Sequence, residues 1–163
     1  RIHPIHEGTT GIHGLDLLGR KMLLHEGLGW KMLQKEFQST VKEAKSLSEL
    51  GEIVLTFEKY VQEFASGTAH LLFKRNQGPD YFLADATLFL EGAGLLCMGW
   101  MWLKQAITAQ RALDRGTMEQ NFYLGKIETA RYTMEYELVK LKGLVERFAS
   151  TNYPSIAMKT EWF

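Results

Sequence analysis

The sequence predicts an all-α fold: an antiparallel bundle of three to four long helices, with an additional N-terminal helix. Three observations lead to this prediction. Apolar residues recur three and four positions apart through most of the 163 residues, the spacing of one helix face. The three prolines, Pro4, Pro79 and Pro154, lie near the edges of these patterns. No segment alternates apolar and polar residues as a half-buried strand does.

The N-terminal helix is expected to begin after residue 8, with Thr9 or Thr10 as its N-cap, because a hydroxyl there accepts a hydrogen bond from the first turn. Gly27 and Gly29 are expected to end it. Its apolar positions at helical spacing are Ile12, Leu15, Leu18 or Gly19, and Met22.

Two amphipathic helices are predicted next. The first places one apolar stripe on a helix with charged residues off the stripe: Trp30, Leu33, Phe37, Val41 and Ala44. The second begins in a serine-rich stretch and keeps its period to about Arg75. Its stripe is Leu50, Ile53 or Val54, Phe57, Val61, Phe64, Thr68 and Leu71. Gly78 and Pro79 then break the chain, and Pro79 suits the start of the next helix.

Two further helices complete the predicted bundle. Residues 81 to 113 are apolar on most faces, which favours a central, buried helix whose glycines admit close neighbours. From Met118 the spacing alternates between three and four, the seam of left-handed bundle packing. The seam is Leu124, Ile127, Arg131, Met134, Leu138, Leu141, Val145 and Phe148. We expect Arg131, its one charged member, to reach solvent or pair with a carboxylate.

Charge and composition restrict the function. Nineteen basic residues balance nineteen acidic ones, with no basic block, so we expect neither nucleic-acid binding nor adhesion to anionic lipid. A single cysteine, Cys97, excludes an intramolecular disulfide and favours a reducing compartment such as the cytoplasm. The polar first ten residues are unlike a signal peptide, and we expect them to be an internal point of a longer chain.

The apolar stretch from 86 to 103 tests for a membrane span. It has nearly the length that a spanning helix needs. However, Glu91 interrupts it, and Gly92, Gly94 and Gly99 dilute it. We therefore expect a buried helix and no membrane span.

The histidines offer weak site candidates. His3 and His6 have a spacing that holds zinc on a helix, with Glu7 beside them, but Pro4 lies between them and no further cluster completes four ligands. No glutamate has a histidine three residues later, as a di-iron bundle requires. We therefore predict no metal site. His70 and the pair Trp100 and Trp102 are interpreted as structural residues.

Glu7 is the strongest candidate, because it precedes Gly8 and two hydroxyls at an expected helix start. Backbone N–H groups at a helix N-terminus favour an anion there. Two interpretations remain open. The carboxylate caps the helix, which the physical chemistry alone favours, or it is a general base held beside an anion-binding helix end.

A resemblance to a known family bears on this choice. The stretch PIHEGTTGIHGLDLLGRK resembles the segment of acyl-CoA dehydrogenases that contains their catalytic glutamate. The stretch NFYLGKIETARYTMEYEL resembles the extra C-terminal helical domain of a long bacterial branch, which includes enzymes similar to 3-methylmercaptopropionyl-CoA dehydrogenase. GWMWLKQA, from the fourth predicted helix, fits that branch too.

The resemblance implies a reaction. Glu7 would remove the proton α to the thioester carbonyl of an acyl-CoA, a hydride would leave the β carbon for FAD, and the product would be a trans-2-enoyl-CoA. Gly8 and Thr9 would lie beside the flavin or its phosphates. The sequence departs from the family pattern at His6, where an aromatic residue is usual, and at His13, where glutamine is usual. An electron-accepting flavoprotein and a homo-oligomer are the partners that the family implies.

The resemblance also implies a division of the chain. Residues 1–26 would end the catalytic C-terminal region, and residues 27–163 would form the extra helical domain. The fragment would carry the base without the flavin and substrate pocket, so we predict that it is inactive alone. Two alternatives remain: a non-enzymatic helical module for oligomerisation or partner binding, and a redox-inactive relative of the family.

Overall fold

The computed structural model describes residues 8–162, and within this range the protein is helical without any strand. The α-helices are α1 (Thr10–Asp16), α2 (Leu28–Ala44), α3 (Gly51–Phe73), α4 (Pro79–Leu83), α5 (Ala86–Asp114), α6 (Gln120–Tyr132), α7 (Leu141–Ala149) and α8 (Pro154–Ala157). The predicted all-α fold is confirmed.

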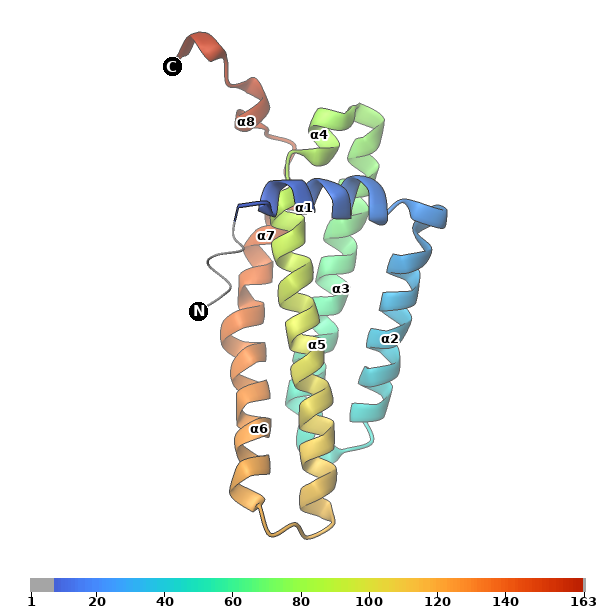
Figure 1. Cartoon of the computed structure of the whole chain (residues 1–163), viewed down its shortest axis with the longest axis vertical. Helices are drawn as coiled ribbons and strands as arrows, with labels where there is room; N and C mark the ends of the chain where they lie inside the picture. Colours follow the sequence, from blue (N-terminus) through green and yellow to red (C-terminus); the bar gives the residue numbers. More distant parts are fainter. Residues whose placement is uncertain (1–7, 163) are drawn as a thin grey trace.

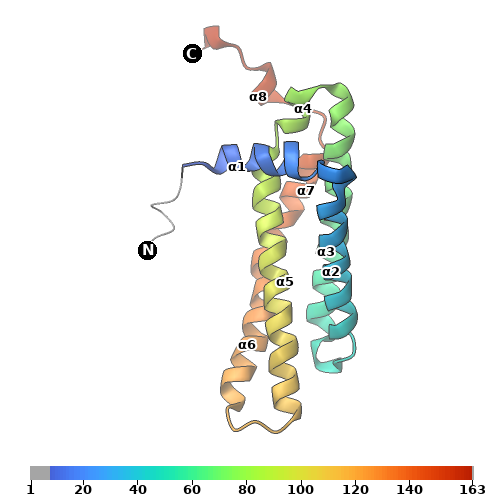
Figure 2. The ribbon, with the colours of Figure 1, turned by 45° about the vertical axis from the view of Figure 1, so that its right-hand side comes forward.

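Four antiparallel legs form the bundle (Figure 1). The legs are α2, α3, α5 and the combined α6–α7, and each leg runs opposite to the leg before it in the chain. A turn at one end joins α2 to α3, and a second turn at the same end joins α5 to α6 (Figures 1 and 2). At the opposite end α1 lies across the start of α5, beside α4 and α8. The predicted bundle with an additional N-terminal helix is confirmed.

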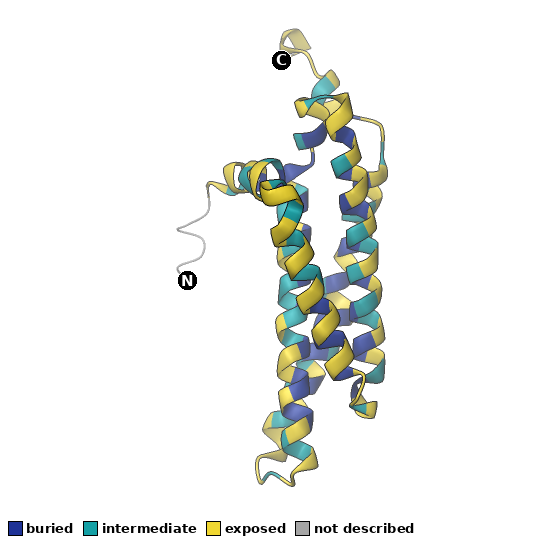
Figure 3. Ribbon diagram, turned by 90° about the vertical axis from the view of Figure 1, so that its right-hand side faces the viewer, coloured by how far each residue is buried: buried dark blue, intermediate teal, exposed yellow. Residues whose placement is uncertain are grey.

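Aromatic rings fill the centre of the bundle. Phe64 of α3 stacks on Phe89 of α5 at 5.4 Å between ring centroids and meets Phe148 of α7 edge-on at 6.1 Å. A Cβ atom added to Gly92 would lie 2.5 Å from the Phe64 ring, so α5 approaches this ring through a missing side chain. Figure 3 shows the buried residues along the inward faces of the helices. Changing the volume of a side chain in so closely packed a core lowers the stability of the fold.

The seam of the last leg is largely confirmed. Five of its members are buried: Ile127, Met134, Leu138, Leu141 and Phe148. Leu124 is 49% exposed, because the α5–α6 hairpin extends beyond the α2–α3 turn and its end has no third helix to cover it (Figures 1 and 2). Arg131 pairs with Glu52 of α3 at 3.1 Å, one of the two expected outcomes.

The last leg is helical throughout, as predicted, but it is not a single regular α-helix. A π-helical segment, Thr133–Glu137, and a 3-10 turn, Leu138–Lys140, separate α6 from α7. A π segment accommodates an extra residue per turn and shifts the phase of the side chains that follow. The seam after the shift still faces the core, as the buried Leu141 and Phe148 demonstrate.

Two helix boundaries also differ from prediction. Gly29 lies inside α2, which begins at Leu28, and the turn before it is made by left-handed residues 25 to 27. The fourth predicted helix is interrupted. Helix α4 starts at Pro79 as expected, but it ends at Leu83, and α5 begins only at Ala86. The interruption contains Asp85, whose carboxylate is buried.

The stretch Pro79–Asp114 is long and apolar enough to cross a membrane by length and composition, since an 18-residue window within it has a mean hydropathy of 1.4. The central helix of a helical bundle meets the same criteria. Here α5 packs against α1, α2, α3, α6 and α7. The absence of a membrane span stays a prediction.

Candidate functional site

The predicted site begins at the start of α1. Glu7, like His3 and His6, lies outside the described residues. Gly8 is exposed with φ +137°, a backbone conformation that favours glycine, and no heavy atom of the described residues 8–162 lies within 4 Å of a Cβ built on it. Thr9 is exposed and occupies the N-cap of α1, as predicted, although its side chain makes no capping hydrogen bond. The backbone that follows Glu7 is therefore open on its outer side.

The helix α1 is seated on the start of α5 by a glycine contact. A Cβ atom on Gly14 would lie 2.7 Å from the Ala86 carbonyl oxygen and 2.9 Å from the Thr87 nitrogen. Leu18 and Met22, one and two turns further on, are buried in the main core. The contact stripe is therefore residues 14, 18 and 22.

The predicted stripe is wrong at its first two positions. Ile12 is 67% exposed and Leu15 is 48% exposed. These residues do follow a helical period. However, α1 crosses the end of the bundle, so the bundle covers one side of this helix only. The apolar outer side is available to contact other protein.

The α4–α5 junction forms the seat under α1. Besides the contact between Gly14 and Ala86, a Cβ on Gly19 would lie 3.1 Å from the Leu83 side chain. A hollow of about 550 Å³ opens beside this seat, lined by Leu15, Pro79, Asp80, Leu83, Ala84, Ser155 and Ile156. Residues from α1, from α4 and its junction with α5, and from the C-terminal tail thus share one surface.

A buried ion cluster lies at the same junction. Asp85 is 4% exposed, and its Oδ1 accepts a hydrogen bond of 2.9 Å from Arg147 Nε of α7. Its Oδ2 lies 3.7 Å from Nζ of Lys74, which is also 4% exposed. Buried charges are stable only when paired, so these three side chains depend on one another.

Tyr153 of the C-terminal tail covers the cluster. Lys74 Nζ lies 4.8 Å and the Arg147 guanidinium 5.1 Å from its ring centroid, within the range of cation–π attraction. Arg147 also donates a hydrogen bond of 2.6 Å to the Asn152 carbonyl. Tyr81 packs edge-on against the Tyr153 ring at 5.2 Å. We call Lys74, Asp85, Arg147 and Tyr153 the junction cluster.

The sequence reasoning missed the junction cluster. One signal was available: Asp85 stands alone between two apolar runs, a place where an unpaired carboxylate is costly. Its partners could not be inferred, because Lys74 and Arg147 come from distant elements and neither is distinguished by its local pattern.

The other charged group on this end is an exposed one. Asp16 and Arg20 form an ion pair one turn apart, and Lys21 lies 3.3 Å from Asp16. The hydrogen bond from Arg20 lowers the pKa of Asp16 below its ordinary value. The same hydrogen bond raises the pKa of Arg20, so this pair stays charged on the surface near neutral pH.

The remaining candidates have structural partners. His70 is exposed, and its Nδ1 lies 2.9 Å from the Ser66 carbonyl. Trp100 donates an indole hydrogen bond of 2.8 Å to Thr40 of α2, whereas Trp102 faces Lys126 of α6. These tryptophans point to different faces, as predicted. Within residues 8–162, no three His, Cys, Asp or Glu side chains gather as a metal site would require.

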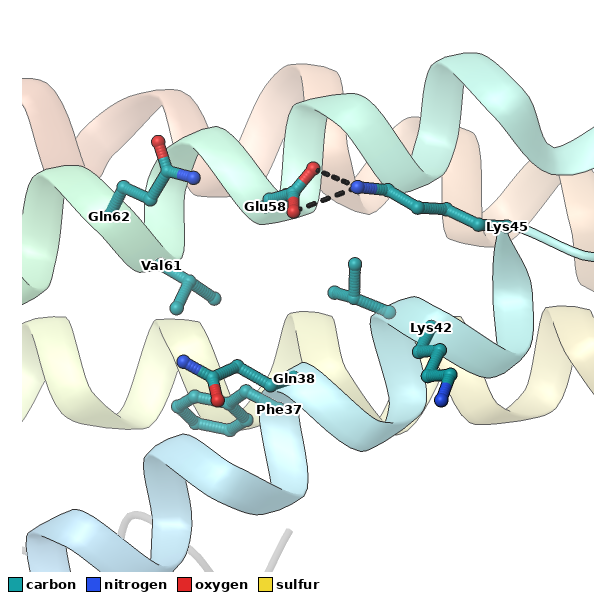
Figure 4. Close-up of a pocket in the computed structure, with 8 residues that line it drawn as sticks. Phe37, Gln38, Lys42, Lys45, Glu58, Val61 and Gln62 are labelled. Carbon is teal, nitrogen blue, oxygen red and sulfur yellow. Dashed lines mark hydrogen bonds and ion pairs between the residues drawn. The ribbon is translucent and has the colours of Figure 1, made fainter.

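A groove of about 320 Å³ separates α2 from α3 (Figure 4). Its floor is apolar, formed by Phe37, Val41 and Val61. The Lys45–Glu58 ion pair, 2.7 Å between charged atoms, closes one side. The groove shares no lining residue with the hollow beside α1.

The chain matches known proteins over most of its length. Residues 33–159 match the family described as "Acetyl-CoA dehydrogenase C-terminal like". The 3-methylmercaptopropionyl-CoA dehydrogenase of Ruegeria pomeroyi is 32% identical over 152 residues, 93% of this chain and 26% of that protein. The broad-specificity linear acyl-CoA dehydrogenase FadE5 of Mycobacterium tuberculosis is 26% identical over 148 residues, 81% of this chain and 23% of that protein.

The chain spans about a quarter of the length of these curated relatives. The match to the family covers well over half of the chain and coincides with the helical bundle. This chain therefore belongs to the acyl-CoA dehydrogenase family.

Proposed function

We propose that the chain is the C-terminal part of an FAD-dependent acyl-CoA dehydrogenase that converts an acyl-CoA thioester to a trans-2-enoyl-CoA. The main support is the 32% identity to a named dehydrogenase over 93% of the chain. The open backbone at Gly8 and Thr9 is compatible with this role, because a catalytic base must be approached by its substrate from one side.

Glu7 is the proposed base. Its carboxylate takes the proton from the carbon α to the thioester carbonyl, and the electron pair of that C–H bond becomes part of the new double bond. The chemistry that a bound FAD supplies is acceptance of a hydride from the β carbon. A carboxylate is a weak base in water, so its work requires desolvation and fixed orientation.

Gly8 and Thr9 are the described residues that would adjoin the flavin. The open space around Gly8 and the uncapped Thr9 side chain fit the approach of a polar group to this backbone. These two residues contribute one edge of a site, and other parts of the parent protein would supply its walls. We therefore propose that the 163-residue chain alone neither retains FAD nor turns over acyl-CoA.

The same proposal includes the setting of the parent enzyme. The division of the chain after residue 26 follows the family resemblance, and a cytoplasmic location follows from the single cysteine. An electron-accepting flavoprotein would reoxidise the enzyme. A homo-oligomer is supported by exposed aromatic side chains on the last leg, where Tyr132 and Tyr136 stack at 4.7 Å between centroids.

Replacing Glu7 by Gln in the full-length protein tests the base. Removing a general base lowers the rate by roughly 10²- to 10⁴-fold. We expect such a loss in flavin reduction by acyl-CoA under anaerobic conditions, with FAD content unchanged. The chain offers a matched control, because the tripeptide His-Glu-Gly recurs at residues 25–27. Glu26 is exposed, and Glu26→Gln should leave flavin reduction at the wild-type rate.

Other outcomes distinguish the alternatives. Flavin reduction that survives Glu7→Gln would leave Glu7 as a helix cap and the chain as a helical module. A wild-type protein that binds FAD but is reduced by no acyl-CoA of a chain-length panel would indicate a redox-inactive relative. Stoichiometric flavin on the purified 163-residue chain would refute its proposed inactivity.

A further inference from the structure

We propose that the junction cluster positions the base-bearing segment, so that Arg147 and Tyr153 act as positioning residues for Glu7. This inference rests on the proposed function. It concerns residues of α7 and the C-terminal tail, which are distant from Glu7 in the sequence. The structural basis is that α1 and the cluster both contact the α4–α5 junction, and that Asp85 and Ala86 are consecutive.

The junction is a short irregular segment with little support of its own. It lies between α4, which ends at Leu83, and α5, which begins at Ala86. The Phe89 N–H donates to the Asp85 carbonyl at 2.9 Å, which ties the junction to the first turn of α5. A segment of this kind is held by side-chain contacts, and short irregular links are where local opening begins.

The base-bearing segment contacts this junction directly. The Gly14 contact reaches the Ala86 carbonyl and the Thr87 nitrogen, which are backbone atoms. The two backbones are too close for an intervening side chain to absorb a movement by changing its rotamer. A displacement of Ala86 is therefore transmitted to α1 and to Thr9 at its start.

The junction cluster fixes the junction from three separate elements. The side chain of Asp85 is held by Lys74, which follows α3, and by Arg147 of α7. Tyr153 covers both cations, and Asn152 receives a hydrogen bond from Arg147. Losing Arg147 leaves the Asp85 carboxylate buried with a single, longer contact to Lys74.

The hydrogen bond from Arg147 is the main polar support of the Asp85 carboxylate among the described residues. Lys74 Nζ, Asp85 Oδ2 and the Tyr153 hydroxyl are buried and make no hydrogen bond to any described residue. Lys74 and Asp85 Oδ2 contribute an ionic contact of 3.7 Å to each other. The bond from Arg147 Nε to Asp85 Oδ1, at 2.9 Å, is shorter than this contact, so removing Arg147 removes the stronger support of a buried charge.

Arg147→Met in the full-length protein tests the inference. We expect flavin reduction at saturating acyl-CoA to slow by roughly 10- to 100-fold, since a misplacement of about 1 Å has this effect. The dissociation constant of acyl-CoA should stay within about twofold, because the cluster does not bind substrate. Arg147→Lys, which keeps the charge beside Asp85, should recover part of the rate. A purely structural role would give no such split between rate and binding.

Hydrogen exchange on the 163-residue chain gives a second readout that is independent of catalysis. In Arg147→Met, exchange should accelerate in residues 9–22 and 83–89, and stay unchanged at the far end of the bundle. The matched control is Arg111→Met, which removes an exposed pair with Glu43 near the other end of α5. It should change neither exchange in residues 9–22 nor flavin reduction.

The outcomes are separable. The positioning role is overturned if Arg147→Met reduces flavin at the wild-type rate, or if its faster exchange is confined to the tail. In that case the proposed function still stands if Glu7→Gln has lost flavin reduction. An active Glu7→Gln refutes the base, and the exchange experiment then decides whether the cluster holds α1. If Arg147→Met does not fold, Tyr153→Leu, which removes both cation–π contacts, is measured in the same two ways.

Discussion

The close contact between α1 and the start of α5 predicts how much stability Gly14→Ala loses. The added Cβ would lie 2.7 Å from the Ala86 carbonyl oxygen, and ordinary contact begins at 3.4 Å. The helix must therefore move by roughly 0.7 Å, and since the obstacle is backbone, no rotamer change relieves it. Overpacking of this kind costs about 1–3 kcal/mol.

The magnitude has an upper limit set by detachment of α1. Releasing α1 together with the π-helical turn Leu17–Lys21 that continues it exposes Leu18 and Met22, each worth about 1.5–3 kcal/mol of burial. Gly11→Ala is the matched control, because it lies in the same helix and nothing is within 4 Å of its Cβ. Both variants gain helix propensity, up to about 1 kcal/mol, so their difference isolates the steric cost.

Urea unfolding followed by circular dichroism at 222 nm measures the difference. We expect Gly14→Ala to be less stable than Gly11→Ala by about 1–3 kcal/mol. In thermal unfolding this corresponds to a difference of roughly 2–12 °C for a chain of this size. Equal stability of the two variants, or a more stable Gly14→Ala, would refute the close backbone contact.

Two further predictions follow from single side chains. Trp100→Phe removes the indole hydrogen bond to Thr40 but keeps the ring contact with Phe37, so the free energy of unfolding should fall by about 1 kcal/mol in urea titration; no change would show that the bond adds nothing. Burial raises the pKa of the Cys97 thiol above its ordinary value, so the folded chain holds this proton to higher pH than the unfolded chain. Iodoacetamide should therefore alkylate native Cys97 far more slowly at pH 8 than urea-unfolded chain, and stability should decline as pH rises past the ordinary thiol value; equal rates would contradict this.

Helical periodicity was enough to predict the bundle, and its failures have physical causes. The stripes of α2, α3 and the last leg became buried faces because each leg has neighbours along most of its length. Ile12 and Leu15 follow the same periodicity but are exposed, because α1 crosses the bundle at its end. Spacing identifies a face of a helix and does not identify what covers it.

The site was predictable only in part. Thr9 occupies its predicted place at the start of α1, and the Glu7 role stays a prediction. The junction cluster was out of reach, because Lys74, Asp85 and Arg147 are brought together by the bundle and by no local motif. The π segment at Thr133–Glu137 was equally hidden, since its residues fit an ordinary heptad pattern.

The length of α5 limits how distant events reach the proposed base. Its 29 residues span about 44 Å, so the turn after Asp114 is far outside the range of direct electrostatic influence on α1. A partner that binds at that turn would affect α1 by moving α5, whose backbone at Ala86 and Thr87 lies against Gly14. A stiff helix with a backbone contact at its near end transmits tilt better than it transmits charge.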